Sequence, residues 1–564
     1  MVGPAAGTGA HAPLREGDMD AATGPRDRPA TSMSPRSGGQ RAVAIIGAGW
    51  AGLACGVALV QAGCKVTVFE AAKVPGGRAR SVAGGDALGT LDNGQHVLIG
   101  PYRETFALMA RVGVDRRRVL RRLPLAVHGT DGLRLHIPAW PLGLGGLLGV
   151  LGARGLGPSG RRALLRVARG VPALVSAPQG AAPDCSVADW LHALQQPPEL
   201  VRRLWAPLCV AALNTPAERA SAQVFARVLH DGLLAAGAAA SIEVPSRPLG
   251  ELLPEPAVAW LHGQGAEVRL GCRVTGLTRS VETDVATDTG TPDGASTALG
   301  TGAADGALGV VAVAVPNDDE SAETTHAKWT LHTTGGKAGP FDAVVVAVAP
   351  HQAAGLLAGH ANDATLRLLG DLEYEAIATV HLRFATPLPS NAGMLTLLQP
   401  DTPQSSGEPP TANTPHGAPG EWLVDHGDGR ASVVISAWRR TTLPHTPARS
   451  DGASGDSLCS DPADAEQATA DPLAAEVEAQ LRRLIPGLPA VTASKTLIEK
   501  RATFACTPGL QRPGHDTGAP GLWLAGDYTA GPYPATLEGA VRSGIECARQ
   551  LVVTLPTYPL QIQP

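Results

Sequence analysis

The chain has 564 residues, a formal net charge of −5 and 44% hydrophobic residues. Its length suits roughly two to four domains, and its slightly acidic balance argues against a nucleic-acid-binding protein. No apolar run reaches the roughly 20 residues of a membrane-spanning helix. The eight cysteines form no CxxC pair and no cluster with histidine, so we expect reduced thiols in a cytoplasmic protein and no metal site.

Four stretches have low sequence complexity. The first 40 residues are rich in Gly, Pro, Ala and Arg, and predict a disordered N-terminal extension without a signal peptide. Met33, shortly before the first predicted strand, is an alternative start of translation. Ranges 282–327, 400–420 and 441–470 show neither a helical nor a strand period, and we expect them to be surface inserts.

Between these stretches, strand-like and helix-like segments alternate. Apolar runs at 42–46, 65–70, 343–348 and 522–525 predict buried strands, and 50–62 and 535–552 predict helices. The first three of these segments in chain order form a β-α-β unit, which is typical of the opening of a parallel sheet. Because the other strands lie far away along the chain, we expect the sheet to be assembled from distant segments.

The turn after the first strand carries the pattern G-x-G-x-x-G at Gly47, Gly49 and Gly52. These glycines permit a tight turn, a close approach of the backbone to a pyrophosphate and close packing of helix on strand. Glu70 ends the second strand, where a carboxylate can accept hydrogen bonds from the adenosine ribose. An acid at this position would repel the 2′-phosphate of NADP. The pattern therefore predicts a dinucleotide site; a purely structural glycine turn is the alternative.

Two further segments favour FAD over NAD. Gly77 and Arg78 follow closely and offer a second flexible backbone and a guanidinium near the pyrophosphate. Asp527, after the last strand, can hold a ribityl hydroxyl. The helix start near Leu537 can direct its positive end at the flavin N1–C2=O edge. The alternatives are a surface turn with a solvated arginine, and a packed βα unit with a capping aspartate.

These features predict an α/β fold (α+β overall) with two domains. A Rossmann-type FAD-binding domain is assembled from the discontinuous segments 41–100, 235–350 and 494–553. A mixed helical and β-sheet substrate domain is formed by 101–234 and 351–493.

Four motifs, GAGWAGLA, VTVFEA, GGRARS and LAGDYTAGPYPATLEGAVRSG, resemble the flavin-dependent amine oxidase / phytoene desaturase superfamily. The segments LDNGQH (91–96), PLCVAALNTP (207–216) and EKRATF (499–504) resemble the hydroxysqualene dehydroxylases within it. The resemblance covers most of 41–552 outside the inserts. It implies FAD contacts at the residues named above, and a further contact with the adenine at Val274.

The resemblance also implies a reaction. Members of that family reduce hydroxysqualene to squalene with loss of water, using reduced FAD, in bacterial hopanoid synthesis. The partners implied are a long-chain isoprenoid and an external electron donor, since the sequence shows no second dinucleotide motif. The alternatives are a carotenoid desaturase on the same cofactor site, and a non-catalytic flavin-binding scaffold that partners a prenyl synthase. An amine oxidase is disfavoured because no aromatic pair can be placed as an amine cage.

Loss of the hydroxyl group requires a general acid. The predicted catalytic residues are His96, with Asp92 to orient it, and Tyr528; Tyr533 is a further candidate. A structural hydrogen bond is an equally open role for His96, and Asn93 to Gln95 could be cofactor contacts only. The pair Asp425–His426 could line the substrate side or form a solvated turn.

The apolar ranges 204–213 and 225–234 are candidate tunnel walls, although ordinary helical core explains them equally. Residues 101–170 carry thirteen arginines against three acids. Within 139–175, an apolar stretch is followed by a basic amphipathic helix. Basic and apolar residues together indicate docking on anionic lipid. With the bacterial family that the sequence resembles, this implies a peripheral position on the inner face of the plasma membrane. A solvated arginine face is the alternative.

Overall fold

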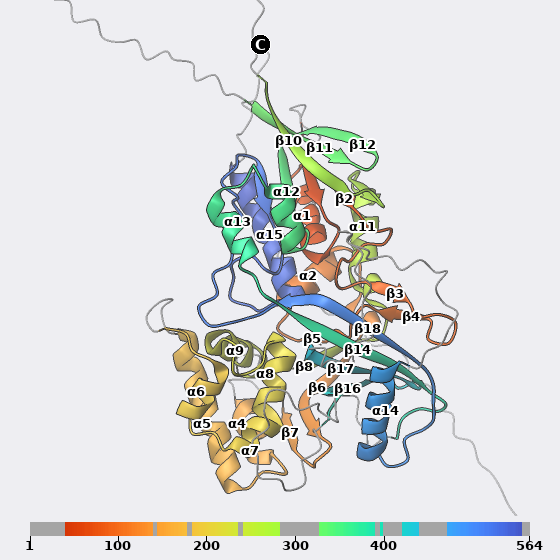
Figure 1. Ribbon diagram of the computed structural model, residues 1–564, viewed down its shortest axis with the longest axis vertical. Helices are drawn as coiled ribbons and strands as arrows, with labels where there is room; N and C mark the ends of the chain where they lie inside the picture. The colour runs from red at the N-terminus through yellow and green to blue at the C-terminus, as the bar shows by residue number, and fades with distance from the viewer. Residues whose placement is uncertain are drawn as a thin grey trace, which may run out of the picture. The chain divides into compact units, whose positions relative to one another are not determined.

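A five-stranded parallel sheet joins the beginning, middle and end of the chain (Figure 1). The computed structural model describes residues 40–138, 144–176, 183–234, 241–282, 326–389, 395–398, 420–438 and 471–554. The sheet order is β19 (Leu522–Leu524), β13 (Ala343–Val346), β1 (Ala42–Ile46), β2 (Lys65–Glu70) and β9 (Glu267–Leu270). Its neighbouring strands are all parallel, which confirms the α/β class and the assembly from distant segments.

Both faces of this sheet are covered, which explains why β1 and β13 are apolar at successive positions. One face packs against α1 (Trp50–Gln61), α11 (Pro254–Gly263) and α15 (Leu537–Thr554). The other face packs against β11 (His326–Thr333) and β12 (Gly336–Phe341), and against α12 (Pro350–Leu357). The two predicted helices of this domain are therefore α1 and α15, with ends displaced by no more than two residues.

The antiparallel strands β10 (Val274–Glu282), β11 and β12 form a three-stranded sheet. Glu282 pairs with His326 at the far end of β10 and β11. The expected insert at 282–327 thus departs and returns at neighbouring backbone positions. Its interior, the extension 1–39, and most or all of the other two expected inserts lie outside the described residues.

A nine-stranded mixed sheet forms the second large layer. Its order is β18 (Val491–Phe504), β14 (Tyr374–Phe384), β17 (Arg430–Trp438), β16 (Trp422–Asp425), β15 (Leu395–Leu397), β6 (Leu120–Gly129), β8 (Ser241–Pro245) and β5 (Leu98–Ile99), with β7 (Arg134–Ile137) paired to β6. Strands β5, β8 and most of β18 come from ranges expected in the FAD-binding domain. They lie here because β18 pairs with β14 along its length and β8 bridges β5 and β6.

Helices lie on two sides of the nine-stranded sheet (Figure 1). One face of β14 and β17 is covered by α14 (Pro472–Leu484), whose apolar side meets alternate residues of both strands. A helical group follows β7: α4 (Leu144–Gly152), α5 (Pro158–Ser176), α6 (Val187–Ala193), α7 (Pro198–Leu200), η2 (Val201–Trp205), α8 (Ala206–Leu213), α9 (Ala222–Leu229) and η3 (His230–Leu234). The remaining elements are β3 (Ser81–Ala83), β4 (Thr90–Asp92), α2 (Arg103–Arg111), α3 (Arg116–Val119), α10 (Leu249–Leu252) and α13 (Asp363–Gly370).

Candidate functional site

The glycine turn between β1 and α1 is packed too closely for side chains. Gly47 has φ +109°, and a Cβ there would lie 2.5 Å from the carbonyl oxygen of Ala347. A Cβ at Gly52 would lie 2.0 Å from the carbonyl oxygen of Gly47. These contacts bring β1, β13 and α1 together, and fix the N-terminus of α1 at the carboxyl edge of the sheet.

The N-terminus of α1 is open to an anion. Its cap residue Gly49 supplies no side-chain hydrogen bond, and the first turn holds no acidic residue. The Gly76 N–H donates to the carbonyl of Ala48 at 2.8 Å, and Gly77 faces Gly49 backbone to backbone. Unpaired N–H groups and the helix dipole at such an end favour phosphate. The local structure therefore fits a pyrophosphate beside Gly49 and Gly77.

Glu70 lies beside this turn. One of its carboxylate oxygens accepts from the Ala48 N–H at 2.7 Å and the other from the Ala72 N–H at 2.8 Å. The Glu70 carbonyl accepts from the Cys272 N–H at 2.8 Å, which brings the buried Val274 close to Glu70. The two residues expected at the adenosine end of the cofactor are thus held together.

Arg78 joins this region to the last part of the chain. Its guanidinium forms an ion pair with Asp527, 449 residues away, and donates to the carbonyl of Ala502 on β18 at 2.7 Å. Burial lowers the pKa of Arg78, but the charge of Asp527 and the hydrogen bond to it outweigh this, and the net pKa is raised. The structure therefore brings Glu70, Gly77, Arg78 and Asp527 to one edge of the sheet.

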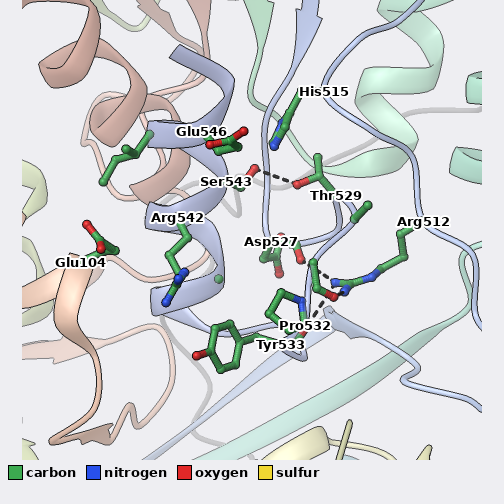
Figure 2. Close-up of a pocket in the computed structure, with 14 residues that line it drawn as sticks. Glu104, Arg512, His515, Asp527, Thr529, Pro532, Tyr533, Arg542, Ser543 and Glu546 are labelled. Atoms are coloured by element: carbon green, nitrogen blue, oxygen red, sulfur yellow. Dashed lines mark hydrogen bonds between the residues drawn. The ribbon is translucent and has the colours of Figure 1, made fainter. Parts of the chain in front are cut away.

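The loop from Asp527 to α15 is held by one arginine. Arg512 donates to the carbonyls of Asp527 at 3.3 Å and Tyr533 at 3.1 Å, and also to that of Gly531 (Figure 2). The Gly539 N–H donates to the hydroxyl of Thr536 at 3.0 Å, which caps α15 just before its first residue, Leu537. Sequence reasoning missed Arg512, because a lone arginine in a loop carries no motif.

The segment 92–96 lies between the cofactor residues and the nine-stranded sheet. The Asn93 amide donates to the carbonyl of Arg78 and to Glu499 of β18, both at 3.3 Å. His96 Nδ1 lies 2.8 Å from the carbonyl of Gly94 and therefore carries the proton. Burial lowers the pKa of His96, and the charge of Arg78 lowers it further. His96 is thus neutral, with Nε2 as an acceptor.

The Asp92 carboxylate is held by hydrogen bonds from α10 and β3. It accepts a hydrogen bond at 2.8 Å from the N–H of Leu249, which is the first residue of α10. Burial raises the pKa of Asp92 to about 6, although this hydrogen bond and the one from Ser81 oppose the rise. Asp92 and Gln95 line a cavity of about 410 Å³.

The two tyrosines expected near the flavin are hydrogen-bonded through their hydroxyls. Tyr528 is buried and donates to the carbonyl of Val348 at 2.9 Å, and burial raises its pKa. Tyr533 donates to Asp231 at 3.0 Å and lines a second cavity, of about 320 Å³ (Figure 2). Of the residues expected to contact the cofactor, Asp527 alone lines this second cavity.

The motif at 207–216 connects α8 to the nine-stranded sheet through Asn214. Asn214 ends α8 with φ +48° and is buried. Its amide donates to Thr503 of β18 at 2.9 Å, and its oxygen accepts from the Ala437 N–H at 2.6 Å. The motif therefore fastens α8 to two strands. Leu204, Leu213 and Phe225, from the candidate tunnel walls, pack in the largest core cluster.

Comparison with known proteins agrees with this geometry. The model of the flavin containing amine oxidoreductase family matches residues 50–317 and 323–552, and the chain belongs to this family. It is an FAD-dependent oxidoreductase, and the residues around Gly49, Glu70, Arg78 and Asp527 fit the cofactor. An oxidoreductase from Methanosarcina mazei shares the fold, with TM-score 0.57, 14% identity, and 90% and 100% of the two chains covered. Cyclohexylamine oxidase from Brevibacterium oxydans also shares the fold, with TM-score 0.57 and 15% identity; the match covers 91% of this chain and 99% of that chain.

Curated relatives add a second level of similarity. The hydroxysqualene dehydroxylase of Rhodopseudomonas palustris is 28% identical over 531 residues, which cover 90% of this chain and 97% of the relative. That of Sinorhizobium fredii is 28% identical over 530 residues, with the same coverage. The resemblance inferred from the LDNGQH, PLCVAALNTP and EKRATF segments is confirmed. A zeta-carotene desaturase of Synechocystis is 42% identical, but over only 79 residues, or 14% of this chain.

Proposed function

We propose that this oxidoreductase reduces hydroxysqualene to squalene with loss of water. The observation that carries the proposal is the similarity to hydroxysqualene dehydroxylases across 90% of the chain. The position of the LDNGQH segment supports it. Asn93 links Arg78, at the cofactor residues, to Glu499 of β18, so this segment connects the FAD-binding residues with the nine-stranded sheet.

Reduced FAD supplies the hydride for this reaction. The protein's own residues would hold the cofactor: the Gly49 and Gly77 backbones at the pyrophosphate, Glu70 at the ribose, and Asp527, held by Arg78, at the ribityl chain. A long isoprenoid requires an apolar wall, since its binding derives from burial of hydrocarbon. Ile242 and Val244 of β8 and Val424 of β16 form an apolar cluster on the nine-stranded sheet, and are candidates for that wall.

A carotenoid desaturase is the second candidate. Matches to such enzymes favour it, but the zeta-carotene desaturase of Synechocystis aligns with only 14% of this chain. It would use the same cofactor residues in the oxidative direction. A non-catalytic scaffold is set aside, because the family to which the chain belongs is one of flavin containing oxidoreductases.

Anaerobic turnover with hydroxysqualene distinguishes these functions. We expect the purified holoenzyme, with its flavin chemically reduced, to form squalene in step with flavin reoxidation, measured by gas chromatography and by absorbance. A Gly52→Val variant is the control, because its side chain would collide with the Gly47 carbonyl, so FAD and turnover should be lost together. Absence of squalene from flavin-loaded enzyme, or desaturation of a polyene by oxidised enzyme, would contradict the proposal.

A further inference from the structure

We infer that His426, Ser432 and His381 form a proton relay, and that it ends at a site for the hydroxyl group of the ligand in the 410 Å³ cavity. The inference rests on the proposed function, because it supplies the proton with which the leaving hydroxyl departs as water.

The three side chains come from adjacent strands. His381 of β14 pairs with Ser432 of β17, and His426 directly follows β16. The Ser432 hydroxyl lies 3.1 Å from His381 Nδ1 and 3.1 Å from His426 Nε2. Ser432 is 1% exposed and His381 is 5% exposed. The three side chains therefore form a continuous hydrogen-bonded chain.

Because the Ser432 hydroxyl has a single hydrogen, the hydrogen bonds that join the three side chains have two possible arrangements. If Ser432 donates to His381 Nδ1, it accepts from His426 Nε2–H, and His381 carries its proton on Nε2. If Ser432 donates to His426, then His381 Nδ1–H donates to Ser432, and His381 Nε2 is a lone pair. A proton arriving at His426 can thus pass through the serine and leave from His381 Nε2.

The cavity end of the relay lacks a partner. His381 lines the cavity, and its Nε2 atom has no hydrogen-bond partner in the described part of the chain. The backbone of Asp92 lies close to the ring and partly offsets the lowering of the His381 pKa by burial. Because a buried polar atom without a partner is costly, Nε2 is suited to a ligand oxygen.

Charge favours a neutral ligand oxygen. Burial lowers the pKa of His381 to about 4, and that of His426 to about 4, so both rings are neutral at rest. The charged and titratable groups around them carry both signs: Lys495 and Asp92 near His381, Arg121, Arg430 and Asp428 near His426, and Arg247 on the cavity wall. A hydroxyl group therefore fits Nε2 better than an anion or a cation.

The site adjoins the cofactor side of the sheet. Thr379 and His381 share one face of β14, since they are two residues apart. A Cβ at Gly94 would lie 3.9 Å from the Thr379 hydroxyl, and Gln95 lines the cavity with His381. The same segment reaches Arg78 through Asn93. The relay thus ends beside the segment that contacts the cofactor residues.

Departure of the hydroxyl group as water uses one proton and one hydride. The carbon–oxygen bond breaks and its electron pair leaves on oxygen, which takes the proton from His381 Nε2 and departs as water. The carbon receives a hydride, with its electron pair, from the reduced cofactor. One solvent proton taken up at His426 restores the charge of the relay, and rotation of the Ser432 hydroxyl with a change of tautomer in both imidazoles then restores the starting arrangement.

Ser432→Ala tests the relay. We expect it to retain FAD and its absorbance spectrum, and to form squalene at least about tenfold more slowly, with a changed solvent isotope effect. Ser432→Thr restores the hydroxyl and should recover much of the rate. His192→Gln, on an exposed position of α6, should match the wild type.

A second readout needs no turnover. Hydroxysqualene added to oxidised holoenzyme should shift the ¹⁵N resonance of His381 Nε2, identified by its loss in His381→Gln, whereas squalene should not. The relay is overturned if Ser432→Ala forms squalene at the wild-type rate, or if the two ligands act alike on Nε2. Failure of the wild type to form any squalene would instead overturn the proposed function.

Discussion

Single residues act here chiefly through charges that the fold removes from water. The Asp527 side chain is 7% exposed and that of Arg78 is 34% exposed. The Asp527 carboxylate is therefore less solvated, and its charge depends more on stabilisation by Arg78 than the charge of Arg78 depends on Asp527. Removing one partner of such a pair leaves a poorly solvated charge, which costs more than the pair itself contributes. This asymmetry gives a prediction at the cofactor site.

Arg78→Gln should lower the free energy of unfolding of the FAD-free protein by about 2 kcal/mol, less than for a fully buried pair because Arg78 is partly solvated. It should also lower the FAD content of the purified protein. Adding Asp527→Asn should recover part of the stability but not the FAD. Urea denaturation and the ratio of flavin to protein absorbance measure the two effects.

Arg482→Gln is the matched control, because Arg482 and Glu478 form an exposed pair on α14. Its effect should stay within about 0.5 kcal/mol. Equal losses from Arg78→Gln and Arg482→Gln would show that the ion pair with Asp527 does not hold the site together.

Among the secondary-structure elements, the contact between α1 and α15 decides where the cofactor can bind. Both helices present their N-termini to the site, and they pack side by side (Figure 1). A Cβ at Gly544 would lie 2.1 Å from the carbonyl oxygen of Ala51 and 2.9 Å from the Cys55 nitrogen. The two backbones therefore approach as closely as they do only because residue 544 has no side chain.

Gly544→Ala should force α15 away from α1. We expect a loss of unfolding free energy of about 1–3 kcal/mol, as for overpacked cores, together with weaker FAD binding, since the two helix N-termini move apart. Calorimetry and flavin titration of the FAD-free protein measure these effects. Gly263→Ala on α11 is the control: its Cβ would enter open space, so neither quantity should fall. Unchanged FAD affinity in Gly544→Ala would mean that helix spacing does not control the site.

For the molecule as a whole, the basic helical region of α4 and α5 bears on whether the protein docks on a lipid surface. The apolar side of α5 is buried in the core, while Arg161, Arg162 and Arg169 are exposed. On α4, Leu148 is 37% and Leu151 is 54% exposed. Within the described ranges, no helix is long and apolar enough to span a bilayer. Lipid docking remains a proposal, and α4, rather than the apolar side of α5, is its apolar component.

The protein should sediment with anionic phosphatidylglycerol vesicles at low salt and be released as the salt concentration rises, because screening weakens attraction to the surface. Leu151→Ser should weaken sedimentation. Val553→Ser, which changes an apolar residue that is 75% exposed on α15, should not. Salt-independent sedimentation with neutral vesicles would contradict the electrostatic part of the proposal.

The cofactor half of the site could be predicted because its contacts are local. The turn at Gly47–Gly52 and the acid at Glu70 belong to one β-α-β unit, whose geometry follows from glycine and from strand period. Arg78 and Asp527 could be named but not paired, because their contact spans 449 residues. His381 and Ser432 could not be found at all: each stands alone in a strand pattern, and only the register of β14 on β17 joins them.

The sequence by itself determined the α/β class, the FAD cofactor and the family, because glycine spacing and buried strands impose those structures locally. The tertiary structure decided which strands pair and which side chains contact one another. It placed β5, β8 and most of β18 in the nine-stranded sheet, turned Asp92 toward the cavity, engaged the Tyr528 hydroxyl on a carbonyl, and lined up two neutral histidines through one serine. Such arrangements depend on strand register and on burial, and these follow from packing across the whole chain.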